Sequence, residues 1–155
     1  MGSKGGVGAN EYFFRVQEGS KVGQFYGFEY AGLDETGNIL VYVDGTDEEG
    51  NRNKVLASTA DPANKKYIGN GVPTHFVSWN NTFRYKNFDL NVFFRGALGF
   101  EIFNMQKYGM GLIGAGSDNV LRSSYLDETN AYASGGVISS YFLEKGDWFK
   151  LESLT

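Results

Sequence analysis

The feature that most constrains the fold of this chain is a pair of alternating segments between Phe76 and Gly99, joined at Lys86-Asn87. Side chains along a β-strand point to opposite faces with a period of two residues. The first segment alternates the apolar residues Val77, Trp79, Phe83 and Tyr85 with the polar residues Ser78, Asn80, Thr82 and Arg84. The second alternates Phe88, Leu90, Val92, Phe94 and Leu98 with Asp89, Asn91 and Arg95. A two-residue turn pairs Tyr85 with Phe88, so the predicted hairpin has one apolar face and one polar face.

This pattern is typical of a hairpin from a membrane-spanning β-barrel. Such a strand needs about 9–11 tilted residues, and aromatic residues flank its lipid-facing band. The polar set carries the charged residues Arg84, Asp89 and Arg95, which a packed soluble core tolerates only with partners. An ordinary antiparallel hairpin, with its apolar face on a soluble core, has the same alternation. The pattern alone leaves both interpretations open.

Composition favours an all-β chain and excludes several functions. Aromatic residues make up 16% of the 155 residues, with 22 glycines and only 2 prolines, which favours antiparallel strands with long turns. The net charge is −4 and the basic residues are scattered, so we expect no nucleic-acid binding. No run of 18 apolar residues predicts a transmembrane helix. Cysteine is absent, which excludes disulfides and thiolate chemistry.

The ends and the longest connection of the chain set its expected organisation. Residues 1–10 are rich in glycine and lack the apolar core of a signal peptide, so we predict a flexible leader followed by one domain over residues 11–155. The connection from Phe100 to Ser140 is far longer than a hairpin loop. We expect short helices in it, one over Phe100–Lys107 and one over Val120–Arg122.

No catalytic or metal-binding residue is predicted. The acidic segment Asp44–Asn53 does not follow the spacing of a calcium-binding loop, and we interpret it as a solvated loop. The single histidine, His75, has no serine or cysteine partner at a known motif spacing and no second metal ligand beside it. We therefore expect no enzyme activity and no cofactor.

Four segments resemble, in the same order, the carboxy-terminal part of the SusC/RagA family of TonB-dependent outer-membrane transporters of Bacteroidetes. They are GSKVGQFYGFEYAGLDETGN (Gly19–Asn38), YIGNGVPTHF (Tyr67–Phe76), FRYKNFDLNVFFRGALGFEIFN (Phe83–Asn104) and SSYFLEKGDWFKLESLT (Ser139–Thr155). Members of the family are several times longer and have about 22 strands. The resemblance therefore implies a fragment of the transmembrane barrel, with about six strands and without the last strands of the family.

The resemblance also implies a function for the full-length parent. The family imports oligosaccharides or peptides across the outer membrane, together with a SusD-like surface lipoprotein and with TonB. Such a parent resides in the outer membrane, in contact with its lipid. The substrate itself is beyond what the sequence predicts, because specificity would lie in loops and a plug that are mostly outside this sequence.

Within the fragment, three sets of residues are candidates for function. The lumen-facing candidates are Asn80, Arg84, Asn91 and Arg95, and the lipid-facing set is Trp79, Phe83, Tyr85, Phe88, Leu90, Val92 and Phe94. The long connection would be extracellular, because the Lys86-Asn87 turn is of the short periplasmic kind. Its Tyr108, Tyr125 and Tyr132 are candidates for contact with substrate or lipoprotein. The alternative is a soluble β-rich carbohydrate-binding module, which would bury Phe88, Leu90, Val92 and Phe94 under another sheet.

Overall fold

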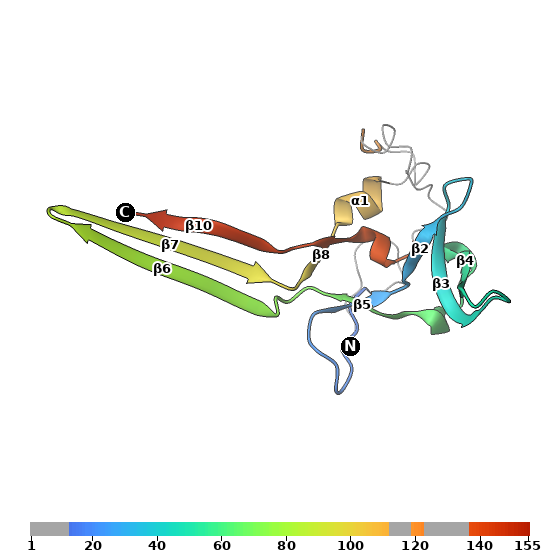
Figure 1. Cartoon of the computed structure of the whole chain (residues 1–155). Helices are drawn as coiled ribbons and strands as arrows, with labels where there is room; N and C mark the ends of the chain where they lie inside the picture. Colours follow the sequence, from blue (N-terminus) through green and yellow to red (C-terminus); the bar gives the residue numbers. More distant parts are fainter. Residues whose placement is uncertain (1–12, 112–118, 123–136) are drawn as a thin grey trace.

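The structure, a computed structural model, describes residues 13–111, 119–122 and 137–155. Its strands are β1 (Gln24–Gly27), β2 (Tyr30–Leu33), β3 (Ile39–Thr46), β4 (Arg52–Leu56), β5 (Lys66–Asn70), β6 (His75–Tyr85), β7 (Phe88–Leu98), β8 (Glu101–Phe103), β9 (Leu143–Lys145) and β10 (Trp148–Leu154). Its helices are α1 (Met105–Met110) and the 3-10 turns η1 (Ala57–Thr59), η2 (Pro62–Asn64) and η3 (Ser140–Phe142). In Figure 1, β6, β7 and β10 form a long sheet that projects from the other elements, which we call the base.

The predicted hairpin is confirmed as β6 and β7. Each strand has 11 residues, and the two are antiparallel and in register along their whole length, with Tyr85 opposite Phe88. Lys86 adopts a left-handed backbone conformation (φ 53°), which the right-handed twist of a two-residue hairpin favours. The turn therefore lies at the tip of the long sheet, as far as possible from the base (Figure 1).

The last strand joins the hairpin on the other edge of β7. β10 runs antiparallel to β7, from Trp148 opposite Ala97 to Leu154 opposite Val92. The register shifts between Leu151 and Ser153, so Glu152 forms a bulge. The sheet order is β10-β7-β6, and within the described residues β6 and β10 are each paired on one side only.

The base consists of short sheets that pack around one core. β2, β3 and β4 form a three-stranded antiparallel sheet, while β1 pairs with β5 and β8 pairs with β9. The buried apolar residues are Phe25, Phe28, Ile39, Val41, Ala57, Phe103, Ile138 and Phe142. The structure thus has ten strands among the described residues rather than about six. Six of them have only three to five residues, too few for a period in the sequence to show.

Two turns of the base repeat one motif. Asp34–Asn38 (DETGN) joins β2 to β3, and Asp47–Asn51 (DEEGN) joins β3 to β4. In each turn the aspartate Oδ1 accepts from the backbone N–H of the asparagine, at 2.8 Å and 2.7 Å. The glycine in each has a left-handed φ, 84° at Gly37 and 83° at Gly50, where a side chain would be strained. The solvated loop predicted over Asp44–Asn53 is therefore the end of a hairpin.

The long connection differs in part from the expected helices. Phe100–Lys107 is not one helix, because Glu101–Phe103 is extended and pairs with Leu143–Lys145, and α1 begins only at Met105. Asn104 ends this strand and caps the helix, its side chain accepting from the N–H of Lys107 at 2.8 Å. Val120–Arg122 is not helical. Cross-strand pairing with a segment forty residues later overrides the local helical pattern.

The two ends of the long connection are thereby held together at the base of the sheet. The backbone N–H of Phe28 donates to the carbonyl oxygen of Ile138, and the N–H of Ser140 donates to the carbonyl oxygen of Phe28, each at 3.0 Å. Gly27 permits this crossing, since a Cβ there would lie 2.6 Å from the carbonyl oxygen of Ile138. No helix in the described part of the chain is long and apolar enough to cross a membrane.

Candidate functional site

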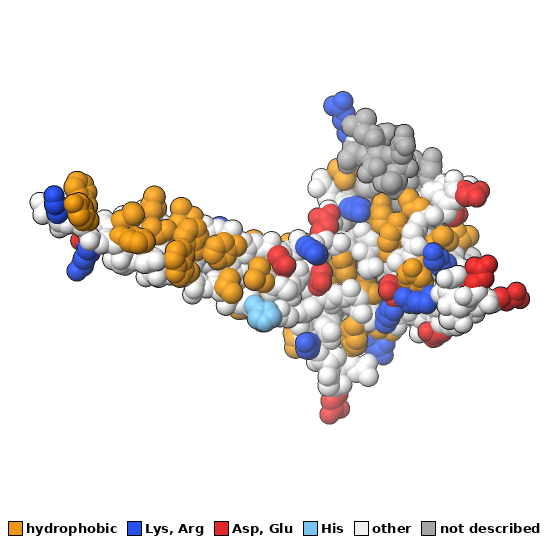
Figure 2. Space-filling view, viewed as in Figure 1, with side chains coloured by type: hydrophobic (Ala, Val, Ile, Leu, Met, Phe, Trp, Pro, Cys, Tyr) orange, Lys and Arg blue, Asp and Glu red, His pale blue; other side chains and the backbone are white. Residues whose placement is uncertain are grey.

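The long sheet of β6, β7 and β10 has one apolar face. Opposite residues in an antiparallel pair lie on the same face, and the register places all seven residues of the predicted lipid-facing set together. We define the apolar face as Val77, Trp79, Phe83, Tyr85, Phe88, Leu90, Val92, Phe94, Leu98, Phe149, Leu151 and Leu154. Figure 2 shows apolar side chains along the projecting sheet.

This apolar face is exposed in the described structure. The side chains of Trp79 and Phe83 are each 54% exposed, and that of Phe88 is 78% exposed. The rings of Trp79, Phe94 and Phe149 stack across the three strands, with centroids 5.5 Å and 5.6 Å apart. An apolar surface of this length, with no described element over it, needs an apolar environment.

The opposite, polar face carries the predicted lumen-facing residues. Asn80, Arg84, Asn91 and Arg95 all lie on it, as the alternation predicted. Arg84 is paired with Asp89 at 3.1 Å near the turn. The amide of Asn91 lies 3.4 Å from the hydroxyl oxygen of Thr82. The hairpin therefore separates most of its apolar and polar side chains. Phe76 and Phe93 lie on the polar face, and Asn81 lies on the apolar face, opposite Val92.

Sequence reasoning missed the contribution of β10 to the polar face. Trp148 and Lys150 lie on it, because they are opposite Ala97 and Arg95. Glu152 joins them, its carboxylate 3.3 Å from Arg95 and 2.9 Å from Lys150. The alternation Trp-Phe-Lys-Leu-Glu at the start of β10 is the signal that predicts this face.

The tyrosines of the long connection have different positions. Tyr108 lies in α1 and packs against the core, its ring centroid 5.1 Å from that of Phe142 and 5.7 Å from that of Phe103. It is half-buried, so it contributes to packing of the base. Tyr125 and Tyr132 lie outside the described residues.

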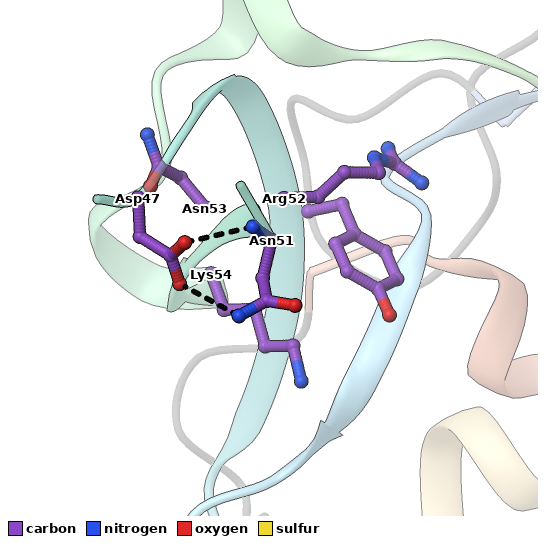
Figure 3. Close-up of a pocket in the computed structure, with 6 residues that line it drawn as sticks. Asp47, Asn51, Arg52, Asn53 and Lys54 are labelled. Atoms are coloured by element: carbon purple, nitrogen blue, oxygen red, sulfur yellow. Dashed lines mark hydrogen bonds between the residues drawn. The ribbon is translucent and has the colours of Figure 1, made fainter. Parts of the chain in front are cut away.

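A polar hollow lies on the β3–β4 hairpin of the base (Figure 3). It is lined by Tyr42, Asp47, Asn51, Arg52, Asn53 and Lys54. The Arg52 guanidinium lies 4.0 Å from the centre of the Tyr42 ring. The Asp47 carboxylate already holds the turn through two hydrogen bonds from Asn51. Among the described residues, no group of three or more histidine, aspartate or glutamate side chains is arranged to hold a metal ion.

One charged cluster connects three strands of the base. Glu29, between β1 and β2, forms ion pairs with Arg52 of β4, at 2.8 Å, and with Lys66 of β5. These hydrogen bonds, that of Arg52 foremost, lower the pKa of the Glu29 carboxyl from about 4.5 to about 2. A lowered pKa means that the charged form stabilises the fold. This contribution is present above about pH 4.5 and is lost as the pH falls toward 2.

We expect Glu29→Gln to lower the free energy of unfolding of the base by about 1 kcal/mol at pH 7, a modest value because all three side chains are partly exposed. The difference from wild type should shrink as the pH falls from 4.5 toward 2. Urea titrations at pH 7 and below pH 3 measure it, with the exposed Glu35→Gln as control. A loss independent of pH would show that the charge of Glu29 does not contribute.

Comparison with known proteins places this architecture in a family. No family model matches the chain. It is 31% identical over 169 aligned residues to TonB-dependent receptor P3 of Formosa agariphila, covering 90% of this chain and 15% of that protein. The fold matches solved structures of the RagAB peptide importer, with a TM-score of 0.68 in its closed-closed state and 0.60 in its open-open state. Each of these two structural matches covers 84% of this chain, at 20% and 19% sequence identity respectively. The chain has the sequence and fold of a segment of a SusC/RagA-type TonB-dependent receptor.

A second solved structure of the RagAB peptide transporter agrees, with a TM-score of 0.66 at 22% identity. The chain spans about 15% of the length of the curated receptor and 16% of the matching RagAB chain. The receptor segment thus consists of a long sheet with two unlike faces and a base at one end of it. The curated relative is a receptor rather than an enzyme, as we expected for this chain.

Proposed function

We propose that the receptor segment forms part of the wall of a transmembrane β-barrel in the outer membrane, and that the complete receptor imports oligosaccharides or peptides. The apolar face then contacts lipid and the polar face lines the lumen. The observation that carries this proposal is the long sheet itself. Its 11-residue strands have the length that a tilted strand needs to cross the hydrocarbon core.

The free edges of the long sheet support a barrel. β6 and β10 each have one edge without a described partner, and unpaired backbone groups in hydrocarbon cost several kcal/mol each. A sheet in the membrane therefore needs further strands on both edges. In a receptor of this family, the neighbouring strands of the barrel would supply them.

The ends of the sheet support one orientation. The Lys86-Asn87 turn is of the short kind that barrels place on the periplasmic side. The base then lies on the extracellular side, where a SusD-like lipoprotein would contact it, and TonB would act from the periplasm. The segment shares the fold of part of a chain in the RagAB peptide importer, and this likeness supports a SusD-like lipoprotein as the partner of the complete receptor.

A soluble carbohydrate-binding module is the second candidate function. It requires another sheet over Phe88, Leu90, Val92 and Phe94. In the described structure Phe88 and Leu90 are 78% and 42% exposed. This exposure favours the transporter.

Cysteine labelling of the complete receptor tests the proposal. The segment contains no cysteine, so single cysteines can be placed at Leu90 and Val92 on the apolar face and at Asn80 and Asn91 on the polar face. In a receptor otherwise free of cysteine and embedded in vesicles, a water-soluble maleimide should label positions 80 and 91. Positions 90 and 92 should resist it, and fluorophores there should be quenched by nitroxide lipids. Equal labelling of the two faces would contradict a membrane position for the sheet.

A further inference from the structure

The polar face of the long sheet has a surplus of positive charge near the base. Its ionisable side chains are three cations, Arg84, Arg95 and Lys150, and two anions, Asp89 and Glu152, which leaves one positive charge. Arg84 and Asp89 neutralise each other near the turn, at 3.1 Å. The surplus therefore lies on the half of the sheet nearer the base, although the whole chain has a net charge of −4.

An indole ring lies beside this surplus charge. Trp148 is 37% exposed and is the first residue of β10, at the end of the sheet next to the base. The Arg95 guanidinium carbon lies 5.7 Å from its ring centre, and the Lys150 ammonium lies 5.6 Å from it. Phe76 stands in the same cross-strand row, since both it and Trp148 are opposite Ala97. The next cross-strand row on this face, toward the turn, contains Ser78 and Arg95.

The two cations keep donors for a ligand. Arg95 is paired with Glu152 through Nη2, and Lys150 is paired with it through Nζ. An arginine side chain has five N–H donors and a lysine side chain has three, so each cation has further N–H donors for a ligand. Their side chains are 52% and 54% exposed. Glu152 fixes both cations beside the ring and adds an acceptor for hydroxyl groups.

Resting on the proposed function, we propose that Trp148, Arg95 and Lys150 form a subsite for an acidic sugar residue of the transported oligosaccharide. The apolar C–H face of a pyranose ring packs on the indole, which combines a large apolar surface with a polar edge. The sugar carboxylate accepts charge-assisted hydrogen bonds from the two cations. The sugar hydroxyls bond to the Glu152 carboxylate and the Ser78 hydroxyl. A neutral sugar leaves the positive charge uncompensated, so the subsite discriminates by charge.

Calorimetric titration of the complete receptor in detergent tests this subsite, with trigalacturonate, maltotriose and a triglutamate peptide as probes. We expect trigalacturonate to bind at least tenfold more tightly than maltotriose, with a difference that falls at high salt. Lys150→Gln should weaken trigalacturonate binding by about tenfold, the scale of one hydrogen bond to a charged group. Trp148→Ala should weaken it similarly, whereas Trp148→Phe should retain most of the affinity.

Arg84→Gln is the matched control, because it removes the same kind of charge from the same face near the turn. It should change the affinity less than twofold. The cysteine-labelling pattern of each variant verifies that the sheet is intact. If the faces label as proposed but trigalacturonate and maltotriose bind equally, the subsite is refuted while the barrel position stands. Stronger binding of triglutamate than of trigalacturonate, lost in Lys150→Gln, also refutes the sugar subsite in favour of an acidic peptide. A labelling pattern that places the polar face, on which Trp148 lies, in lipid refutes both proposals.

Discussion

Replacing Phe94 with arginine should prevent stable insertion of the long sheet. Phe94 lies at the middle of the apolar face, and its ring stacks between those of Trp79 and Phe149. A cation on the lipid-facing side near the bilayer midplane costs about 2–4 kcal/mol, and the loss of aromatic packing adds to it. We expect Phe94→Arg to lower the free energy of unfolding in vesicles by at least this amount. Guanidinium titration of the complete receptor measures it, and the amount of folded receptor in the outer membrane should fall in parallel.

The matched control is Asn91→Arg, three residues from Phe94 on the same strand but on the opposite face. A lumen-facing cation stays in contact with water, so its effect should remain below about 1 kcal/mol. Equal losses for the two variants would show that both faces have the same environment. That result would contradict the assignment of the apolar face to lipid.

Phe142→Ala should open the base without displacing the long sheet. Phe142 is fully buried, and its ring contacts those of Phe103, Tyr108 and Tyr141 at centroid distances of 5.1–5.9 Å. Truncating a buried phenylalanine costs about 3–5 kcal/mol, from lost burial and from the cavity left behind. Amide hydrogen exchange of the complete receptor should report this loss in β8, β9 and α1, which contact Phe142 or its neighbours in the chain.

Val22→Ala serves as the control for Phe142→Ala, because its side chain is 73% exposed. Its effect should stay within about 0.5 kcal/mol. Protection in β6 and β7 should be unchanged in both variants, since their hydrogen bonds do not depend on the core of the base. If the exchange of β8 and β9 is unaffected by Phe142→Ala, then these strands are not held by the core cluster.

The sequence by itself determined the hairpin of β6 and β7. Its signals are local: a period of two over 11 residues in each strand, and a turn that pairs Tyr85 with Phe88. The same alternation assigned Asn80, Arg84, Asn91 and Arg95 to one face. Family-like segments in the right order extended this prediction to the fold class, which the comparisons confirm. The orientation of each face toward lipid or lumen stays a prediction.

Tertiary structure decided what local patterns do not contain. Glu101–Phe103 reads as part of a helix, yet it is a strand, because its hydrogen-bond partners Leu143–Lys145 lie about forty residues away. Trp148 and Lys150 reach the polar face only through the pairing of β10 with β7, and the bulge at Glu152 sets which side chains follow them. Contacts between distant segments depend on register and packing of the whole chain, which no window of the sequence specifies. The cation-flanked Trp148 is for this reason a product of the tertiary fold, whereas the two faces of the hairpin follow directly from the order of its residues.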